Sequence, residues 1–465
     1  MDRKEMTRRR FLSMTAAAAA GGLAVACQPA SQPTPAQAGT GAQDQATAAP
    51  PPATAAPAAQ KVELRFIKLS MGDKQGAYFN DTAVPKFGET YPNIALTIDM
   101  ADWGTLGEKL LTSFAGNLAV DLVETGSDWV GPYARRKQFL PIDDYVANDY
   151  QDEIKDYYPD MVDISRYMGK LMALPYTLDI RTVCYRKDHF EEAGLDPSRA
   201  PDTWDDLVAY GAKLVKTDAQ GQITRAGYMM SASTPADALF EFWYLLVQNG
   251  TDVGSWDVND VKFNGPEGLE ALQFMYDLIN KHKISPITGM TTTNPAVSPL
   301  GEGVTSMAAN GSWEIDNWKS YQPDKIQYLG IGAPPMKKKR LHYACPNVYA
   351  IGSNTKHPDE AWTLLKFMVS TEILTEYLGS NSQSPPRRSV AEGAAYMQDP
   401  LLKAFQEIPA KGWGATTPQA VDFPTLELIG NYVQAALRDE MPLQAALDKA
   451  AEEVKAKITE ALQAG

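Results

Sequence analysis

Aromatic, amide and carboxylate side chains recur at the predicted loops of this chain, where they could bind a ligand with flat apolar faces and polar edges. A sugar has this form, because its C–H faces pack against aromatic rings while its hydroxyls bond carboxylate, amide and guanidinium groups. Tryptophans inside helices belong more often to the core, and we assign Trp204 and Trp362 to it. For each other tryptophan, a core position is an even alternative to binding. The candidate loop residues are Trp103, Asp128, Trp129, Tyr176, Trp243, Trp313, Asn347 and Trp413.

Catalytic motifs are absent from the sequence. It has no His-Glu-x-x-His, no Cys-x-x-Cys, no Gly-x-x-x-x-Gly-Lys-Ser/Thr loop and no Gly-x-Ser-x-Gly elbow. Its four histidines are scattered, and carboxylate pairs such as Asp205-Asp206 stand at predicted helix starts, where the helix dipole explains them. We therefore expect no enzyme: no catalytic residue, no metal site and no cofactor. A secreted glycosidase stays open as an alternative, because glycosidase carboxylates carry no local motif.

Predicted strands alternate with predicted helices along the chain, which favours an α/β fold with parallel strands. Apolar and polar residues alternate in residues 62–67, while residues 266–282 show the helical period. Ligands usually bind such folds in loops at the carboxyl ends of the strands. Further strands are expected at 94–98, 121–124, 181–185, 223–229, 326–331 and 348–351, and further helices at 106–114 and 239–248, after Asp202 or Thr203, after His357, and from about residue 443.

The N-terminus carries a twin-arginine export pattern. Thr7-Arg8-Arg9-Arg10-Phe11-Leu12 opens an apolar run that ends at Ala26, shorter than the roughly 20 residues that cross a bilayer. Because Cys27 follows this run directly, we interpret residues 1–26 as a lipoprotein signal peptide and Cys27 as the lipidated first mature residue. An ordinary signal peptide with an incidental cysteine is the alternative. Residues 27–60, rich in Ala and Pro, are expected to form a disordered tether to a membrane.

Charge and length narrow the class of protein further. The net charge of −14 leaves no basic stripe that could neutralise phosphates, so we exclude nucleic acid as a partner. The basic residues 337–340 are interpreted as a solvated loop. Residues 61–465 exceed one ordinary core, which indicates two lobes, and we expect a monomer. Cys184 and Cys345 could pair in an oxidising compartment, although we slightly favour two unpaired buried thiols.

Six short motifs follow one another along residues 62–464. They are Gly72-Asp73-Lys74, Asp121-Leu122-Val123 with Ser127-Asp128, a Gly-Lys hairpin with Leu-Pro-Tyr in residues 167–176, the strand 183–188, the Pro-x-Thr-Trp-Asp helix start of 201–207 and the Gly-x-Trp segment of 307–313. In this order they resemble the motifs of extracellular solute-binding proteins of ABC importers, the family that includes maltodextrin-type sugar binders.

The resemblance implies an α/β, two-lobed periplasmic-binding-protein-like fold of type II, with the ligand in a cleft between the lobes. The first lobe would comprise residues 61–178 plus 301–352, and the second lobe residues 179–299 plus 353–465. The protein would then be extracytoplasmic, lipid-anchored on the periplasmic or cell-surface face of the membrane, and would deliver a mono- or oligosaccharide to the membrane subunits of an ABC importer. A sensor that reports its ligand to a membrane receptor has the same fold and stays open.

The resemblance also assigns site residues position by position. Hydroxyl-bonding positions map to Asp73, Lys74, Asp128 and Asp179, and aromatic positions map to Phe240, Trp243 and Trp313. Thr125 stands where maltodextrin binders carry another tryptophan. Their C-terminal stacking tryptophan has no clear match, although Phe423 or Trp413 could substitute. We therefore expect a smaller or different saccharide than a long maltodextrin.

Other ligands remain open for the same fold. A polyol, a glycerol phosphate or a small peptide would need different polar partners in the site. A phosphate would call for clustered arginines, for which Arg181 and the pair Arg387-Arg388 are available.

Overall fold

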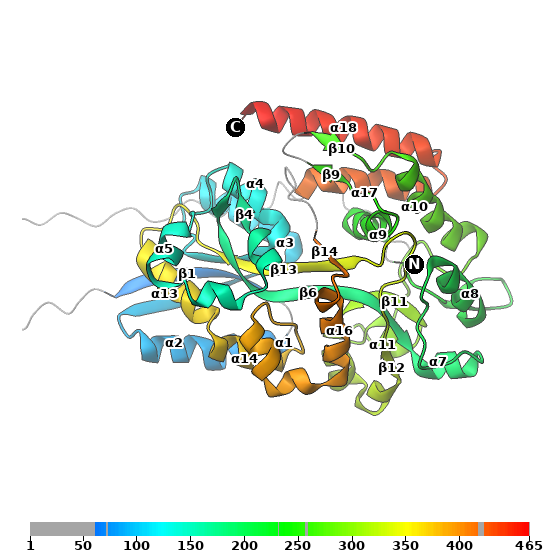
Figure 1. Ribbon diagram of the computed structural model, residues 1–465, viewed down its shortest axis with the longest axis horizontal. Coiled ribbons are helices and arrows are strands. Elements are labelled where there is room, and N and C mark those ends of the chain that lie inside the picture. Colours follow the sequence, from blue (N-terminus) through cyan, green and yellow to red (C-terminus); the bar gives the residue numbers. More distant parts are fainter. Residues whose placement is uncertain (1–60, 71–72, 231, 256–258, 417–422, 465) are drawn as a thin grey trace, which may run out of the picture. The chain divides into compact units, whose positions relative to one another are not determined.

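The computed structural model describes residues 61–464, except residues 71–72, 231, 256–258 and 417–422 (Figure 1). The predicted signal peptide, Cys27 and the tether lie outside the described residues, as do the side chains of Asp73 and Phe423. Within the described ranges, no helix combines the length and the apolar character needed to cross a membrane.

The largest sheet has eight strands, in the order β11-β6-β13-β3-β1-β2, with β12 paired to β6 and β14 paired to β13. These strands are β1 (Val62–Leu69), β2 (Ile94–Ala101), β3 (Leu122–Gly126), β6 (Ala173–Arg186), β11 (Met307–Gly311), β12 (Leu329–Ile331), β13 (His342–Ala350) and β14 (Gly414–Ala415). The β1 strand pairs in parallel with β2 and β3, as predicted. The β13 strand runs antiparallel to both β3 and β6, so the sheet is mixed.

Helices cover the strands β1 and β3 on two faces. We call the buried cluster that contains Phe66 of β1 the first core. Because successive side chains of a strand point to opposite faces, the next residue, Ile67, joins a smaller cluster with Leu110 of α3. The helices of this part are α1 (Asp73–Tyr78), α2 (Val84–Thr90), α3 (Trp103–Ala115), α4 (Val130–Arg135), α5 (Asp143–Asp149), α6 (Pro159–Asp163), α12 (Trp313–Tyr321), α13 (Pro358–Met368), α14 (Thr371–Ser380), α15 (Arg388–Gly393) and α16 (Pro400–Ala410).

A second core forms around the buried helix α9 (Pro235–Gln248), which packs against α17 (Phe423–Leu437) (Figure 1). The other elements here are α7 (Lys187–Glu192), α8 (Trp204–Leu214), α10 (Pro266–Tyr276), α18 (Leu443–Ala464) and the ladders β7 (Lys216–Thr217) with β8 (Ile223–Arg225) and β9 (Gly254–Ser255) with β10 (Asp260–Val261). Thr203 is the N-cap of α8: its side chain accepts a hydrogen bond of 3.1 Å from the amide of Asp206. Local capping chemistry thus sets this helix start, as the sequence predicted.

Two long strands connect the cores. In β6, Tyr176 and Ile180 belong to the first core, and beyond Arg181 the strand faces both cores, with Val183 in the second and Cys184 in the first. In β13, Tyr349 belongs to the first core and Tyr343 to the second. The residues between them, where β6 and β13 run side by side, therefore lie at the passage from one core to the other (Figure 1).

The C-terminal half is divided between the two cores. Helices α13, α14 and α16 contribute Leu365, Tyr377 and Phe405 to the first core. The second core takes up the chain again at α17 and α18. Helical periodicity reports that a segment has an apolar face, but it does not report which core that face meets.

The two other cysteines are buried and form no disulfide among the described residues. Cys184 lies on β6 and Cys345 on the neighbouring β13. Of the two alternatives, the structure therefore has the one without a disulfide.

Candidate functional site

Asp179 and Arg181 form a bidentate ion pair on β6 at the passage between the cores. Two residues apart on a strand, they share a face of the sheet. The Arg181 Nη2 atom lies 2.8 Å from Asp179 Oδ2, and Nε lies 3.1 Å from Oδ1. Arg181 Nη1 donates to the hydroxyl of Tyr244 on α9 at 3.0 Å. Both ends of the guanidinium are thus fixed, so it presents a rigid polar surface.

Three aromatic rings from three elements surround this guanidinium. Its central carbon lies 5.1 Å from the ring centroid of Trp313 on α12, 5.0 Å from that of Tyr343 on β13 and 5.7 Å from that of Phe240 on α9. These distances permit cation–π attraction. The pairing of β11 with β6 sets Gly311 opposite Arg181, which brings Trp313 to the cluster two residues later.

Asp128 reaches Asp179 and Arg181 from the end of β3. We call Asp128, Asp179 and Arg181 the charged cluster. It lies in the 3₁₀ turn Ser127–Trp129 that follows β3. Burial raises the pKa of Asp128 to about 6, and the charge of Asp179 adds to this, whereas backbone amides and Arg181 oppose it. Two carboxylates and one guanidinium therefore share the site, and their net charge is −1 once Asp128 is ionised.

Trp103 stands beside Asp128 at the start of α3. A Cβ atom added to Gly126 would lie 2.2 Å from Asp128 Oδ1 and 3.7 Å from the ring of Trp103, so the absence of a side chain at Gly126 leaves room for both groups. Trp129 meets Trp103 edge-on at 6.3 Å and stacks on Tyr133. Of the tryptophans in the described ranges, only Trp103 and Trp313 are classed as exposed, at 42% and 38%. Both lie next to the charged cluster.

Lys74 contacts α12, the helix that Trp313 begins, and Asn347 lies on β13 between β3 and β6. Lys74 Nζ lies 2.7 Å from Asp316 Oδ1 and 2.7 Å from Ser320 Oγ, both on the helix that Trp313 begins. Asn347 is 9% exposed and is paired with Gly126 and Thr177 in the sheet. Asp73 begins α1 directly before Lys74.

Tyr176, Trp243 and Trp413 occupy different surroundings. Tyr176 is fully buried, stacks on Tyr349 at 4.2 Å and donates to Glu124 at 2.5 Å. Trp243 is 2% exposed, and its indole N–H donates to Asp252 at 2.8 Å. The ring of Trp413 lies near the cations of Arg340 and Lys411. Trp243 also packs edge-on against Tyr343 at 5.9 Å, so it supports a ring that contacts Arg181 without contacting Arg181 itself in the described residues.

The arginines that a phosphate would require do not gather at one place. Arg181 is bound to Asp179, whereas Arg387 Nε lies 2.7 Å from Asp156 Oδ2 and Arg388 stands over the ring of Tyr158. The described residues therefore lack the arginine cluster on which the phosphate alternative depended.

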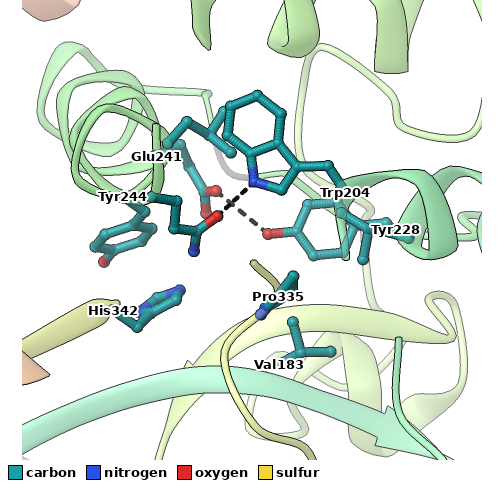
Figure 2. Close-up of a pocket in the computed structure, with 10 residues that line it drawn as sticks. Val183, Trp204, Tyr228, Glu241, Tyr244, Pro335 and His342 are labelled. Carbon is teal, nitrogen blue, oxygen red and sulfur yellow. Dashed lines mark hydrogen bonds between the residues drawn. The ribbon is translucent and has the colours of Figure 1, made fainter. Parts of the chain in front are cut away.

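A small cavity lies behind Tyr244 in the second core (Figure 2). Its volume is about 20 Å³, enough for one water molecule and too little for a sugar. His342 lines it and contacts Tyr244 with ring centroids 4.2 Å apart. Burial, with Arg181, lowers the pKa of His342 to about 3, so the ring is neutral near pH 7. Of the residues that line the cavity, Tyr244 also accepts a hydrogen bond from Arg181.

Tyr244, Tyr343 and His342 were not predicted from the sequence, and Arg181 was considered only for phosphate. A charged residue two positions after Asp179 on a predicted strand was the available signal for Arg181. Nothing local marks the other three, because segments far apart in the chain bring them together.

The profile of the family described as "Bacterial extracellular solute-binding protein" matches residues 72–373. An arabinooligosaccharide-binding protein of Halalkalibacterium halodurans is 23% identical over 330 residues, covering 69% of this chain and 71% of that protein.

Two solved structures are similar in fold. An ABC transporter solute-binding protein of Thermotoga lettingae, bound with α-D-tagatose, has a TM-score of 0.74 at 22% identity and covers 86% of this chain and 100% of its own. Maltose-bound MalE3 of T. maritima has a TM-score of 0.73 at 22% identity and covers 85% of this chain and 99% of its own. The fold is thus the two-lobed one of periplasmic binding proteins, as the resemblance implied.

Proposed function

Because this chain belongs to the family of bacterial extracellular solute-binding proteins, we propose that it binds a mono- or oligosaccharide outside the cytoplasm and delivers it to an ABC importer. The observation that carries the sugar assignment is the cluster of Asp128, Asp179 and Arg181 between two exposed tryptophans, Trp103 and Trp313. Similar proteins named for arabinooligosaccharide, tagatose and maltose support this ligand class.

Each part of the cluster has a role that suits a sugar. The rings of Trp313 and Trp103 would cover apolar C–H faces, and the carboxylates of Asp128 and Asp179 would accept bonds from hydroxyls. Arg181, fixed by Asp179 and Tyr244, would donate to a ring or hydroxyl oxygen with little loss of entropy. A ligand held in this way would contact Asp128, which follows β3, as well as Asp179 and Arg181 on β6.

The proposed site keeps most of the residues that the resemblance assigned. It comprises Asp73, Lys74, Trp103, Asp128, Trp129, Asp179, Arg181, Phe240, Trp313, Tyr343 and Asn347. Tyr176 and Trp243 are left out because both are buried and hydrogen-bonded elsewhere. Trp413 is left out because its ring is occupied by two cations.

The finer assignments rest on the sequence pattern alone. We propose that Cys27 carries the lipid anchor, that residues 1–26 are a twin-arginine signal peptide, and that residues 27–60 tether a monomeric receptor to the membrane. The protein would act by binding, without turnover of its ligand.

Calorimetric titration of the purified protein tests the proposed ligand class. The panel of ligands to be titrated consists of maltose, D-tagatose, arabinotriose, glycerol, glycerol 3-phosphate and a tripeptide. We expect heat of binding with at least one saccharide and none with glycerol 3-phosphate, because the site has a net negative charge. Binding of the phosphate or the peptide alone would overturn the sugar assignment, and hydrolysis of a chromogenic glycoside would overturn the binding-only role.

A further inference from the structure

Glu314 is a buried carboxylate one residue after Trp313, and the proposed site does not use it. The residue is 1% exposed. Its Oε1 atom accepts a hydrogen bond of 2.8 Å from Asn310 Nδ2. Its Oε2 atom accepts from Ser298 Oγ at 2.8 Å and from Trp318 Nε1 at 2.9 Å. Both oxygens therefore accept hydrogen bonds from neutral donors, one at Oε1 and two at Oε2.

These donors come from three separate segments. Asn310 lies on β11, Ser298 is the N-cap of α11 (Pro299–Glu302), and Trp318 lies one turn further along α12. No cation lies within salt-bridge distance of Glu314 in the described part of the chain. Two titratable groups face its partners: Arg186 lies 5.2 Å from the ring centroid of Trp318, and the Cys184 thiol, whose pKa burial and the charge of Glu314 raise, lies 3.7 Å from the Asn310 carbonyl oxygen.

Such a carboxylate reduces stability. Burial raises the pKa of Glu314 to about 7, although the bonds from Ser298 and Trp318 oppose this. An uncompensated buried charge is expensive, and an apolar residue of similar size would pack here at lower cost. Stability therefore does not account for Glu314, whose three hydrogen bonds join separate segments of the chain.

They hold the turn from β11 into α12, from which the ring of Trp313 projects. The helix lacks a side-chain cap at Ser312, so capping does not fix its first turn. A Cβ atom on Gly311 would lie 2.0 Å from the ring of Trp313, which shows that the indole lies flat against the Gly311 backbone. Gly311 in turn pairs with Arg181. The position of the indole over Arg181 thus depends on how residues 310–314 are held.

We propose that Glu314 is a positioning residue that ties Asn310, Ser298 and Trp318 together and thereby aims the ring of Trp313 at Arg181. Its importance for ligand binding rests on the proposed function. The positioning itself exists without ligand, so it can be tested separately.

Fluorine NMR of protein labelled with 5-fluorotryptophan tests the positioning in the absence of ligand. The Trp313 resonance is assigned by its loss in W313F. In E314A we expect this resonance to shift or broaden. In E314Q it should stay near its wild-type position, because the amide can accept from Ser298 and Trp318 while its N–H donates to a reoriented Asn310 amide.

The matched control is D149N. Asp149 Oδ1 also accepts from an indole, Nε1 of Trp362 at 2.9 Å, but this pair contacts no residue of the proposed site in the described ranges. D149N should leave the Trp313 resonance unchanged. An unchanged Trp313 resonance in E314A, or an equal shift in D149N, would overturn the proposal. If E314A does not fold, N310A removes the Oε1 bond alone and must perturb the same resonance.

A double-mutant cycle then tests the consequence for binding, with maltose and D-tagatose as probes. E314A should weaken binding about tenfold, and in a W313A background it should weaken binding no further, because both changes act through one ring. If the losses of binding free energy in E314A and W313A add in the double mutant, Glu314 does not act on binding through Trp313. If the wild-type protein binds neither these probes nor any other saccharide of the panel, the proposed function fails, and the NMR result still decides the positioning.

Discussion

Trp313 offers a direct residue-scale test of the proposed stacking role, because its indole is exposed and lies 5.1 Å from the guanidinium of Arg181. We expect W313A to weaken saccharide binding by about 1–3 kcal/mol, since it removes one face of the sugar's apolar contact. Calorimetric titration with the saccharide that binds the wild-type protein measures the change. The control is Y321A, which removes another exposed aromatic from the same helix. Equal affinity of W313A and Y321A would exclude Trp313 from the site.

The raised pKa of Asp128 predicts that its ionised carboxylate lowers the stability of the folded protein near pH 7 while it strengthens saccharide binding. Burial, with Asp179, raises its pKa from 3.8 to about 6 in the folded protein. Between these pH values the folded protein holds a proton that the unfolded chain has lost, so this group stabilises the fold as pH falls and destabilises it above pH 6. We expect D128N to be more stable than wild type at pH 7 by about 1–3 kcal/mol and equal to it near pH 4.

Urea unfolding of both proteins at pH 4, 5 and 7 measures this difference. The comparison must be between variants, because His342, with its pKa lowered to about 3, gives the wild-type protein an opposite slope. The same variant should bind saccharide more weakly at pH 7, since an amide is a poorer acceptor than a carboxylate. A D128N protein no more stable than wild type at pH 7 would contradict the desolvation of Asp128.

The candidate site could be predicted in part at the residue scale. Asp128, Asp179, Phe240 and Trp313 were assigned through sequence motifs, and all four contact or electrostatically affect Arg181. Tyr176 was chosen by the same reasoning, yet it lies inside the first core with its hydroxyl bonded to Glu124. A motif specifies residue type and order, whereas burial depends on partners that are distant in the chain.

At the scale of elements, the capping box of α8 permits a test that separates stability from binding. Thr203 accepts from the amide of Asp206, while the carboxylate of Asp206 accepts from the amide of Thr203. T203A should therefore lower the free energy of unfolding by about 1 kcal/mol. Saccharide affinity should not change, because α8 contributes no residue to the proposed site.

The matched control for T203A is T112A, which also removes one threonine hydroxyl, from helix α3. The hydroxyl of Thr112 bonds only backbone carbonyls within its own helix, so its removal should change stability by less than about 0.5 kcal/mol. Equal losses for T203A and T112A in thermal unfolding would mean that the cap does not stabilise α8.

Elements set by local chemistry were predicted better than those set by pairing. The start of α8 and the strands β1 and β2 follow from capping and alternation. The full length of β6 was missed, because its residues are almost continuously buried and only its second half was assigned as a strand. The core that α13 to α16 join could not be predicted either, since nothing in their periodicity identifies their partner.

At the scale of the whole molecule, lipidation predicts where the protein resides. C27S should remove the proposed acyl anchor, whose chains contribute about 0.8 kcal/mol per buried CH₂, and move the protein from the membrane to the soluble fraction. Fractionation followed by immunoblotting measures this shift, and C345S serves as the control because Cys345 is buried in the described structure. Equal membrane retention of C27S and wild type would contradict the anchor.

The arrangement of the two cores predicts that ligand binding changes the shape of the molecule. Because β6 and β13 pass between cores whose side chains belong to separate clusters, one core can rotate about these strands while each stays packed. Asp128 and Trp103 stand with the first set of elements, and Phe240 stands with the second, so a saccharide that contacts all three favours the closed arrangement. Small-angle X-ray scattering should therefore show a smaller radius of gyration at saturating saccharide, and no change for W313A at a concentration too low to saturate it. If the radius of gyration of the wild-type protein does not change at saturating saccharide, the result would contradict closure and would indicate a rigid receptor.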